Sequence, residues 1–320
     1  MKKSFSVLVV LMLLVSMVAF AGGQREADPA ARLVGFAQVD TQNPWRLAET
    51  ESVQSAAADR GYELIFVDGQ ANQANQIRAL RSFIAQGVDG ILLAPIVTTG
   101  WGPVLREAKD AGIPVVLLDR NIEETERDLV VTFIGSDFVW QGEQAAEQMI
   151  RDLGEGPLRI AELQGQPGAD PTIERKRGFE NVIDRYPNIE IIVSQTGQFN
   201  RAEGKQVMEA FLQSRGDEID VVYAHNDDMA IGAIQAIREF GLNPGEDIYL
   251  ISIDGVRDAF VAMMDGDLNA TVESSPLMGP MGFDALEAAW RGEELPEWIK
   301  IDDETFTMDQ AAGVIDSREY

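Results

Sequence analysis

The sequence predicts an α/β fold made of two doubly wound parallel sheets, which we call the first and the second lobe. Short apolar runs alternate along the chain with longer segments whose apolar residues recur at steps of three and four, as in strands followed by helices. The runs are apolar at nearly every position, for example Ile91 to Ala94, and strands covered by helices on both faces need that composition. With 320 residues, the chain is also long enough for two hydrophobic cores.

Five apolar runs and the segments between them form the first lobe in this prediction. The expected strands are 33–39, 63–67, 90–94, 114–118 and 129–134. The expected helices are 44–60, 72–86 and 101–111. Gly61, Gly87 and Gly112 each separate a helical segment from the next strand, which is typical of glycines that end a helix with a positive φ.

The same alternation restarts after Asp137 and predicts the second lobe. The expected helices are 138–153, 172–186, 202–214 and 229–240, and the expected strands are 158–163, 189–194, 219–224 and 248–253. A strand at 270–273 should lead the chain back to the first lobe, before a helix near 277–291 and a final segment at 305–315.

Both lobes are therefore expected to be discontinuous in sequence. We predict a first lobe of residues 32–136 plus 275–303 and a second lobe of residues 137–274 plus 304–320. A hinge of three strands near Ser136, Ser274 and Asp302 should join them.

The composition excludes several kinds of chemistry. The chain has no Cys and one His, so thiol nucleophiles, disulfides and zinc sites built from Cys or several His are impossible. We therefore expect no metal and no cofactor. Its 53 Asp and Glu outnumber its 26 Lys and Arg, and the net charge of −27 repels nucleic acid and anionic membrane surfaces.

The N-terminus has the pattern of a secretory signal peptide. Lys2 and Lys3 precede an apolar run at 7–15, and Ala19-Phe20-Ala21 offers small residues for cleavage near Ala21. The run is shorter than the roughly 20 residues that span a bilayer, so we expect residues 1–21 to be removed and no membrane insertion. Without a Cys that could be lipidated, the periplasm is the expected location.

Polar and aromatic side chains follow the predicted strands. In open parallel sheets, ligands bind beyond the carboxyl ends of the strands, where these side chains are expected to lie. The candidate binding residues are Trp45, Arg46, Asp119, Arg120, Arg175, Phe199, Asn226 and Asp254. Carboxylates accept hydrogen bonds from neighbouring hydroxyls, guanidinium groups donate them, and an amide does both. Aromatic faces cover the apolar side of a sugar ring. Together these groups suit a neutral sugar better than a strongly anionic ligand.

Each candidate also has a purely structural interpretation. Asp119 and Arg120 could form an ordinary surface ion pair, and Trp45 could be the first apolar residue of a core helix. Asn226 could simply cap a helix. His225 is assigned no role. The prediction depends on the candidates lying together.

Several stretches carry a family resemblance. They are VGFAQV at 34–39, WR at 45–46, QIRALRSFIAQG at 76–87, LLDR at 117–120, RKRGF at 175–179, YAHNDDMAIGA at 223–233 and SIDGV at 252–256. The chain resembles the periplasmic sugar-binding proteins of ABC transporters of the ribose-binding type, which share the periplasmic binding protein type I fold with the lactose-repressor family. It is most similar to the galactofuranose-binding branch, although Asn43-Pro44 is closer to the ribose-binding pattern.

The resemblance implies a binding protein rather than an enzyme. It implies a site made of the eight candidates, with Glu273 as a weaker addition, that captures a monosaccharide such as galactofuranose by hinge closure. The implied partners are the sugar and an ABC permease, and we expect a monomer. A sugar sensor for a chemoreceptor or sensor kinase is the alternative. A glycoside hydrolase using Asp119 and Asp254 is less favoured, because three nearby guanidinium groups should keep both carboxylates ionised and leave no general acid.

Overall fold

The computed structural model describes residues 31–320, of which Arg32–Tyr320 form one compact unit. The predicted signal peptide and its cleavage point lie outside the described residues. Within the described part of the chain, none of the helices combines the length and the apolar character needed to cross a membrane.

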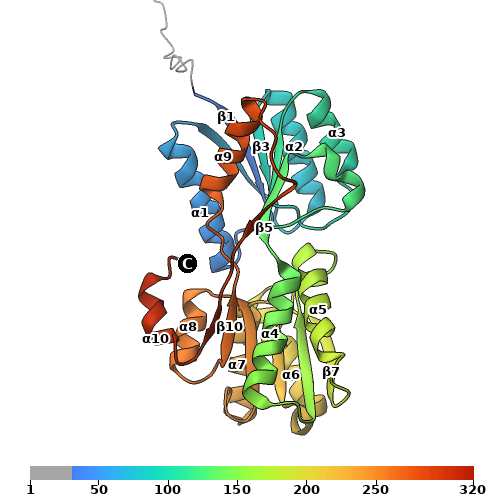
Figure 1. The fold of residues 1–320 in the computed structure, drawn as a ribbon, viewed down its shortest axis with the longest axis vertical. Coiled ribbons are helices and arrows are strands. Elements are labelled where there is room, and N and C mark those ends of the chain that lie inside the picture. The colour runs from blue at the N-terminus through green and yellow to red at the C-terminus, as the bar shows by residue number, and fades with distance from the viewer. Residues whose placement is uncertain (1–30) are drawn as a thin grey trace, which may run out of the picture. The chain divides into compact units, whose positions relative to one another are not determined.

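The first sheet has six parallel strands in the order β11-β5-β4-β3-β1-β2. They are β1 (Leu33–Gln38), β2 (Glu63–Asp68), β3 (Gly90–Leu93), β4 (Val115–Leu118), β5 (Thr132–Ser136) and β11 (Trp298–Ile301). The helices are α1 (Pro44–Asp59), α2 (Gln73–Gln86), α3 (Gly102–Asp110) and α9 (Gly279–Trp290), with a short 3-10 helix at Glu124–Leu129. Helices α1 and α9 cover one face of the sheet and α2 and α3 the other (Figure 1).

The second sheet also has six strands, in the order β12-β10-β9-β8-β6-β7. They are β6 (Leu158–Gln164), β7 (Ile189–Thr196), β8 (Val221–Ala224), β9 (Tyr249–Asp254), β10 (Ala270–Glu273) and β12 (Thr305–Thr307). Helices α4 (Phe138–Leu153) and α5 (Asp170–Ile183) pack on one face, and α6 (Arg201–Arg215), α7 (Asp227–Phe240) and α8 (Arg257–Met264) pack on the other. The C-terminal segment contains α10 (Ala311–Val314) and a 3-10 turn at Ile315–Ser317, and a second 3-10 turn at Gly216–Glu218 follows α6.

The predicted fold class, two doubly wound sheets, is confirmed, with one local difference. Strand β12 pairs antiparallel with β10, whereas all other neighbours in both sheets are parallel. The reason is the direction of the chain. Strand β10 leads out of the second sheet toward the first, and β12 brings the chain back, so the two strands run in opposite directions side by side.

The chain passes between the two sheets three times. The crossings lie between β5 and α4, between β10 and α9, and between β11 and β12. They fall in the segments where the sequence places the lobe boundaries and the hinge. Those exact bounds stay a prediction.

Gly87 illustrates how the helices end. It follows α2 with φ of 68°, and its N–H contacts the carbonyl oxygens of Ile84 and Phe83. This left-handed conformation is favourable for Gly because it lacks a Cβ. Gly61 and Gly112 have φ of 69° and 72°, so the predicted glycine caps are confirmed.

Candidate ligand-binding site

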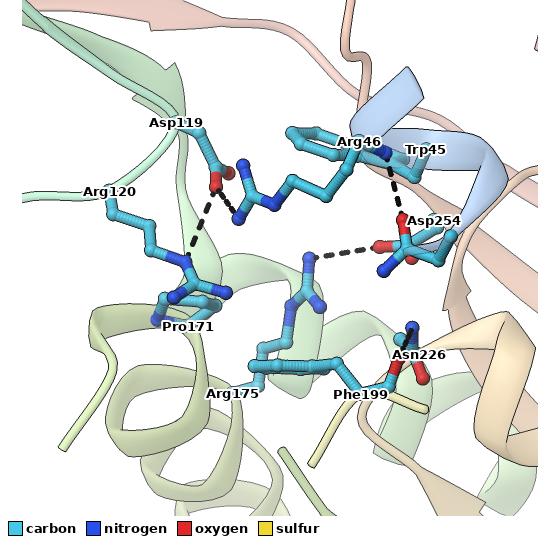
Figure 2. A pocket seen from close by; sticks show the side chains of 10 residues that line it. Trp45, Arg46, Asp119, Arg120, Pro171, Arg175, Phe199, Asn226 and Asp254 are labelled. Atoms are coloured by element: carbon cyan, nitrogen blue, oxygen red, sulfur yellow. Dashed lines mark hydrogen bonds and ion pairs between the residues drawn. The ribbon is translucent and has the colours of Figure 1, made fainter. Parts of the chain in front are cut away.

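A cavity lies between the carboxyl ends of the strands of both sheets (Figure 2). It is lined by Asn43, Trp45, Arg46, Asp119, Arg120, Pro171, Arg175, Phe199, Asn226 and Asp254. Eight of the nine predicted site residues are therefore together. The cavity holds about 310 Å³ of empty space, including space that is open to solvent.

Glu273 is the predicted residue that does not line this cavity. It ends strand β10, and its carboxylate pairs with the guanidinium group of Arg318 in the C-terminal segment. Its backbone oxygen accepts a hydrogen bond of 3.0 Å from Gln141 Nε2. Glu273 therefore belongs to the surroundings of the cavity.

The first lobe's aromatic residue and one arginine are positioned by the start of α1. Asn43 caps this helix, because its side-chain oxygen accepts a hydrogen bond of 2.8 Å from the backbone N–H of Arg46. Pro44 occupies the first turn, where a missing N–H is tolerated. Trp45 is 5% exposed, and its Nε1 donates a hydrogen bond of 2.6 Å to the backbone oxygen of Ser274. The indole ring is thereby fixed at the edge of the cavity.

Arg46 is held by two buried carboxylates. Its Nη2 lies 2.5 Å from Asp119 Oδ2, and its Nη1 lies 2.6 Å from Glu49 Oε2. Gln38 Nε2 donates a further hydrogen bond of 2.9 Å to the same Glu49 oxygen. Burial acts to lower the pKa of Arg46, but the charges of Asp119 and Glu49 outweigh it, so the pKa is raised and the side chain stays cationic.

Arg120 connects the two sides of the cavity. Its Nη1 donates to the backbone oxygen of Ile96 at 3.0 Å and to Gln166 Oε1 at 3.2 Å. Its guanidinium group lies 5.4 Å from the ring centre of Phe199. Burial, followed by the nearby charge of Arg46, lowers the pKa of Arg120 to about 10. Its Nε is buried without a hydrogen-bond partner in residues 31–320, although Asp119 Oδ2 lies 3.5 Å away.

Arg175 has a comparable position in the second lobe. It projects from α5, and its Nη2 lies 3.4 Å from Asp254 Oδ1. Its Nη1 donates to the backbone oxygen of His225 at 2.6 Å, and its Nε donates to Gln141 Oε1 at 2.9 Å. All three guanidinium nitrogens are therefore in use, which fixes the direction of the side chain.

Asp254 contradicts one expectation. Burial raises the pKa of the Asp254 carboxyl well above its ordinary value, even though the cation of Arg175 opposes that shift. The direction of this shift differs from the expectation that the arginines govern the pKa of this carboxyl, because the loss of hydration exceeds the attraction of Arg175 at 3.4 Å.

Three cavity residues have a backbone conformation that favours Gly. Asp119, Phe199 and Asp254 have φ of 61°, 58° and 134°. Each such residue costs on the order of 1–3 kcal/mol, and strain of this kind is concentrated at binding and active sites. The conformations turn side chains at the ends of β4 and β9, and before α6, into the cavity.

Sequence reasoning missed residues that line the cavity or support it. Asn43 and Pro171 line it, and Glu49 and Gln141 orient two of its arginines. Glu49 could have been found, because it lies three residues after Arg46 on the same helix face. Gln141 gives no such signal. Among residues 31–320, His, Asp and Glu side chains nowhere form a group of three or more that could hold a metal ion.

Known proteins resemble the chain over most of its length. Residues 34–294 match a family model described as a periplasmic binding protein domain. Galactofuranose-binding protein YtfQ of Escherichia coli (strain K12) is 48% identical over 303 residues, which cover 94% of this chain and 95% of the relative.

Two solved structures have nearly the same fold. A crystal structure of a galactofuranose binding protein has a TM-score of 0.88 and 46% identity, covering 90% of this chain and 98% of the other. The periplasmic binding protein component of the arabinose ABC transporter from Shewanella sp. ANA-3, bound to α- and β-L-arabinofuranose, has a TM-score of 0.87 and 48% identity. The matched region covers 90% of this chain and 95% of the arabinose-binding chain.

Proposed function

Because the chain belongs to the periplasmic binding protein family, we propose that it captures one neutral furanose sugar, galactofuranose or a close relative, and delivers it to an ABC permease. The family resemblance predicted from the sequence is thereby confirmed. The protein is a solute-binding protein rather than an enzyme, as its relatives are. One observation carries the proposal: eight polar and aromatic residues from both sheets line a single small cavity.

The side chains of this cavity match the chemistry of a sugar. The carboxyl groups of Asp119 and Asp254 accept hydrogen bonds from hydroxyls, and Arg46, Arg120 and Arg175 donate them. Trp45 and Phe199 provide flat apolar faces for the C–H side of a ring. A hydroxyl group both donates and accepts, so a mixed set of donors and acceptors favours a polyol.

The charges around the cavity favour an uncharged ligand. Three guanidinium groups, those of Arg46, Arg120 and Arg175, are accompanied by three carboxyl groups. Two of these carboxyls line the cavity, and Glu49 lies behind Arg46. Each arginine already has an acidic neighbour, so a strongly anionic ligand would have to compete with these carboxyl groups for the guanidinium groups.

Contacts between the two sides support capture by closure of the lobes. Besides the bond from Arg120 to Gln166, the backbone N–H of Asn121 donates to Asp170 Oδ2 at 3.0 Å, and Thr98 N–H donates to the Gly168 oxygen at 3.0 Å. A ligand that touches residues of both sheets favours the arrangement in which they are close. We place the hinge at the three crossings of the chain between the sheets.

The remaining parts of the proposal concern location and partners. Relatives of this chain are periplasmic binding proteins, and we propose export through the predicted signal peptide, with cleavage near Ala21. We further propose that the protein acts as a monomer, and that the closed, sugar-loaded form is recognised by the permease. The family assignment does not favour the sensory alternative.

Isothermal titration calorimetry of the mature chain tests the sugar class. D-Galactose, L-arabinose and D-ribose each contain some furanose in solution, whereas myo-inositol has none and serves as the control. We expect at least one of the three sugars to bind with a Kd near 1 μM, which corresponds to a binding free energy of about −8 kcal/mol. Binding of none of them, or equal binding of myo-inositol, would contradict the proposal.

A further inference from the structure

A second cavity adjoins the first and shares four of its lining residues. These are Asn43, Arg46, Arg120 and Phe199. The second cavity encloses about 860 Å³ of empty space, including solvent at its mouth, against about 310 Å³ in the first. The two cavities therefore meet at these four side chains.

The second cavity is lined mainly by polar side chains from loops of both sheets. The residues that it does not share with the first cavity are Asp40, Gln42, Pro44, Gln166, Gln198, Asn200, Arg201, Asp228 and Asp258. The loop after β1 supplies two of them, Asp40 and Gln42, and the loop between β7 and α6 supplies Gln198 and Asn200. The second cavity thus has the same two-sided construction as the first.

Carboxamide groups in this cavity are free to bind a ligand. Gln42 and Gln198 are exposed, and within residues 31–320 only their backbone N–H groups, not their side chains, make hydrogen bonds. Gln166 uses its Oε1 to accept from Arg120, and its Nε2 makes no bond there either. An amide both donates and accepts, so these groups match hydroxyls as closely as the groups of the first cavity do.

The charged groups of the second cavity are largely paired. Arg201 Nη2 lies 2.7 Å from Asp228 Oδ1 and 2.8 Å from Asp258 Oδ2. Arg46 and Arg120 are engaged with Asp119. With its arginines already paired, the cavity has little to attract a phosphate or carboxylate, so the chemistry again favours an uncharged polyol.

The backbone between β7 and α6 is shaped around both cavities. Gln198 and Phe199 are consecutive and both have φ of 58°, an uncommon conformation for residues other than Gly. Phe199 lines both cavities and Gln198 lines the second. The strained turn at Gln198 and Phe199 therefore contributes side chains to both cavities.

We propose that the second cavity binds a second sugar unit, joined by a glycosidic bond to the furanose in the first. This inference rests on the proposed function and extends its ligand class to furanosyl disaccharides. The glycosidic oxygen passes between Asn43 and Arg46 on one side and Arg120 and Phe199 on the other, the four residues common to both cavities. Gln42, Gln166 and Gln198 then bind hydroxyls of the second unit.

Calorimetry with two ligands and two variants tests this inference. The ligands are D-galactose and a disaccharide of two galactofuranose units, in which either unit can occupy the first cavity. The double variant Gln42→Ala/Gln198→Ala removes the free amides. Gln195→Ala, an exposed residue of β7 outside both cavities, is the matched control.

We expect the wild-type chain and the control to bind both ligands. In the double variant the Kd for the disaccharide should rise at least fivefold, while the Kd for galactose changes less than twofold. The inference is overturned if galactose binds and the disaccharide does not, or if the double variant leaves the ratio of the two Kd values unchanged. Failure of both ligands to bind the wild-type chain would also overturn the inference, whereas the proposed function fails only if D-galactose, L-arabinose and D-ribose all fail to bind.

Discussion

Glu49 Oε2 accepts a hydrogen bond of 2.6 Å from Arg46 Nη1, and the two side chains, one helical turn apart, are 0% and 6% exposed. Asp119 binds the other terminal nitrogen of the same guanidinium group. A carboxylate outside the cavity therefore determines how an arginine inside it is presented to the ligand.

Glu49→Gln should weaken sugar binding about tenfold. Gln is nearly isosteric but carries no charge, so Arg46 loses one of the two ionic contacts that hold it. Calorimetry with the best-binding sugar measures the effect. Glu51→Gln, an exposed position on the same helix, is the control, and an equal affinity of both variants would show that Glu49 does not position Arg46.

Arg175→Ala should weaken sugar binding at least tenfold without unfolding the protein. The change removes a charged donor next to Asp254, and charged hydrogen bonds contribute roughly 1.5–3 kcal/mol each. Circular dichroism checks the fold and calorimetry measures the affinity. Arg177→Ala, whose side chain is 59% exposed, is the matched variant on the same helix. Unchanged affinity of Arg175→Ala would exclude this residue from the site.

Trp45→Phe should abolish most of the change in tryptophan fluorescence that the sugar causes. Trp45 lines the cavity, and its ring is fixed by the bond of 2.6 Å to the Ser274 oxygen, which Phe cannot make. We also expect the affinity to fall several-fold. A fluorescence titration measures both effects, with Trp298→Phe as the control outside the cavity. A full fluorescence response in Trp45→Phe would contradict contact between this ring and the sugar.

Asp170→Asn should raise the unfolding free energy above that of the wild type, and by more at pH 7.5 than at pH 4.5. Burial raises the pKa of Asp170 from 3.8 to about 6, partly opposed by the hydrogen bond from the Asn121 N–H. Between these two values the folded state binds more protons than the unfolded state, so the contribution of Asp170 to stability falls as the pH rises. Asn keeps the acceptor for Asn121 and carries no charge.

The expected gain in unfolding free energy of the Asn variant over the wild type is at most about 3 kcal/mol at pH 7.5 and about 1 kcal/mol at pH 4.5. Urea unfolding at the two pH values measures it. Asp184→Asn, an exposed position at the other end of α5, should show no such difference. A pH-independent effect of Asp170→Asn would mean that its charge is not the cause.

The sequence contained enough information for the fold and for most of the cavity. Apolar runs such as Val115–Leu118 mark buried parallel strands, and the carboxyl ends of such strands meet at one edge of a sheet. Residues directly after the strands, among them Asp119 and Asn226, therefore had to lie near one another within each sheet. The family resemblance added the expectation that the two groups face the same space.

The misses have physical reasons. Glu273 is the last residue of a strand, but its carboxylate pairs with Arg318, forty-five residues further along, which no local pattern predicts. Gln141 lies inside a helix and reaches Arg175 only through the packing of α4 on α5. The pKa of Asp254 depends on how completely the folded chain excludes water, and composition alone does not reveal that.

The three crossings of the chain have a consequence for the integrity of the protein. A protease that nicks one connection between the sheets divides the chain into two fragments, but strands of both fragments remain paired in one sheet, through β11 with β5 or β12 with β10. Neither sheet is formed by one continuous stretch of sequence, since β11 joins the first after the second is almost complete. A chain ending after β10 would therefore lack an edge strand from each sheet.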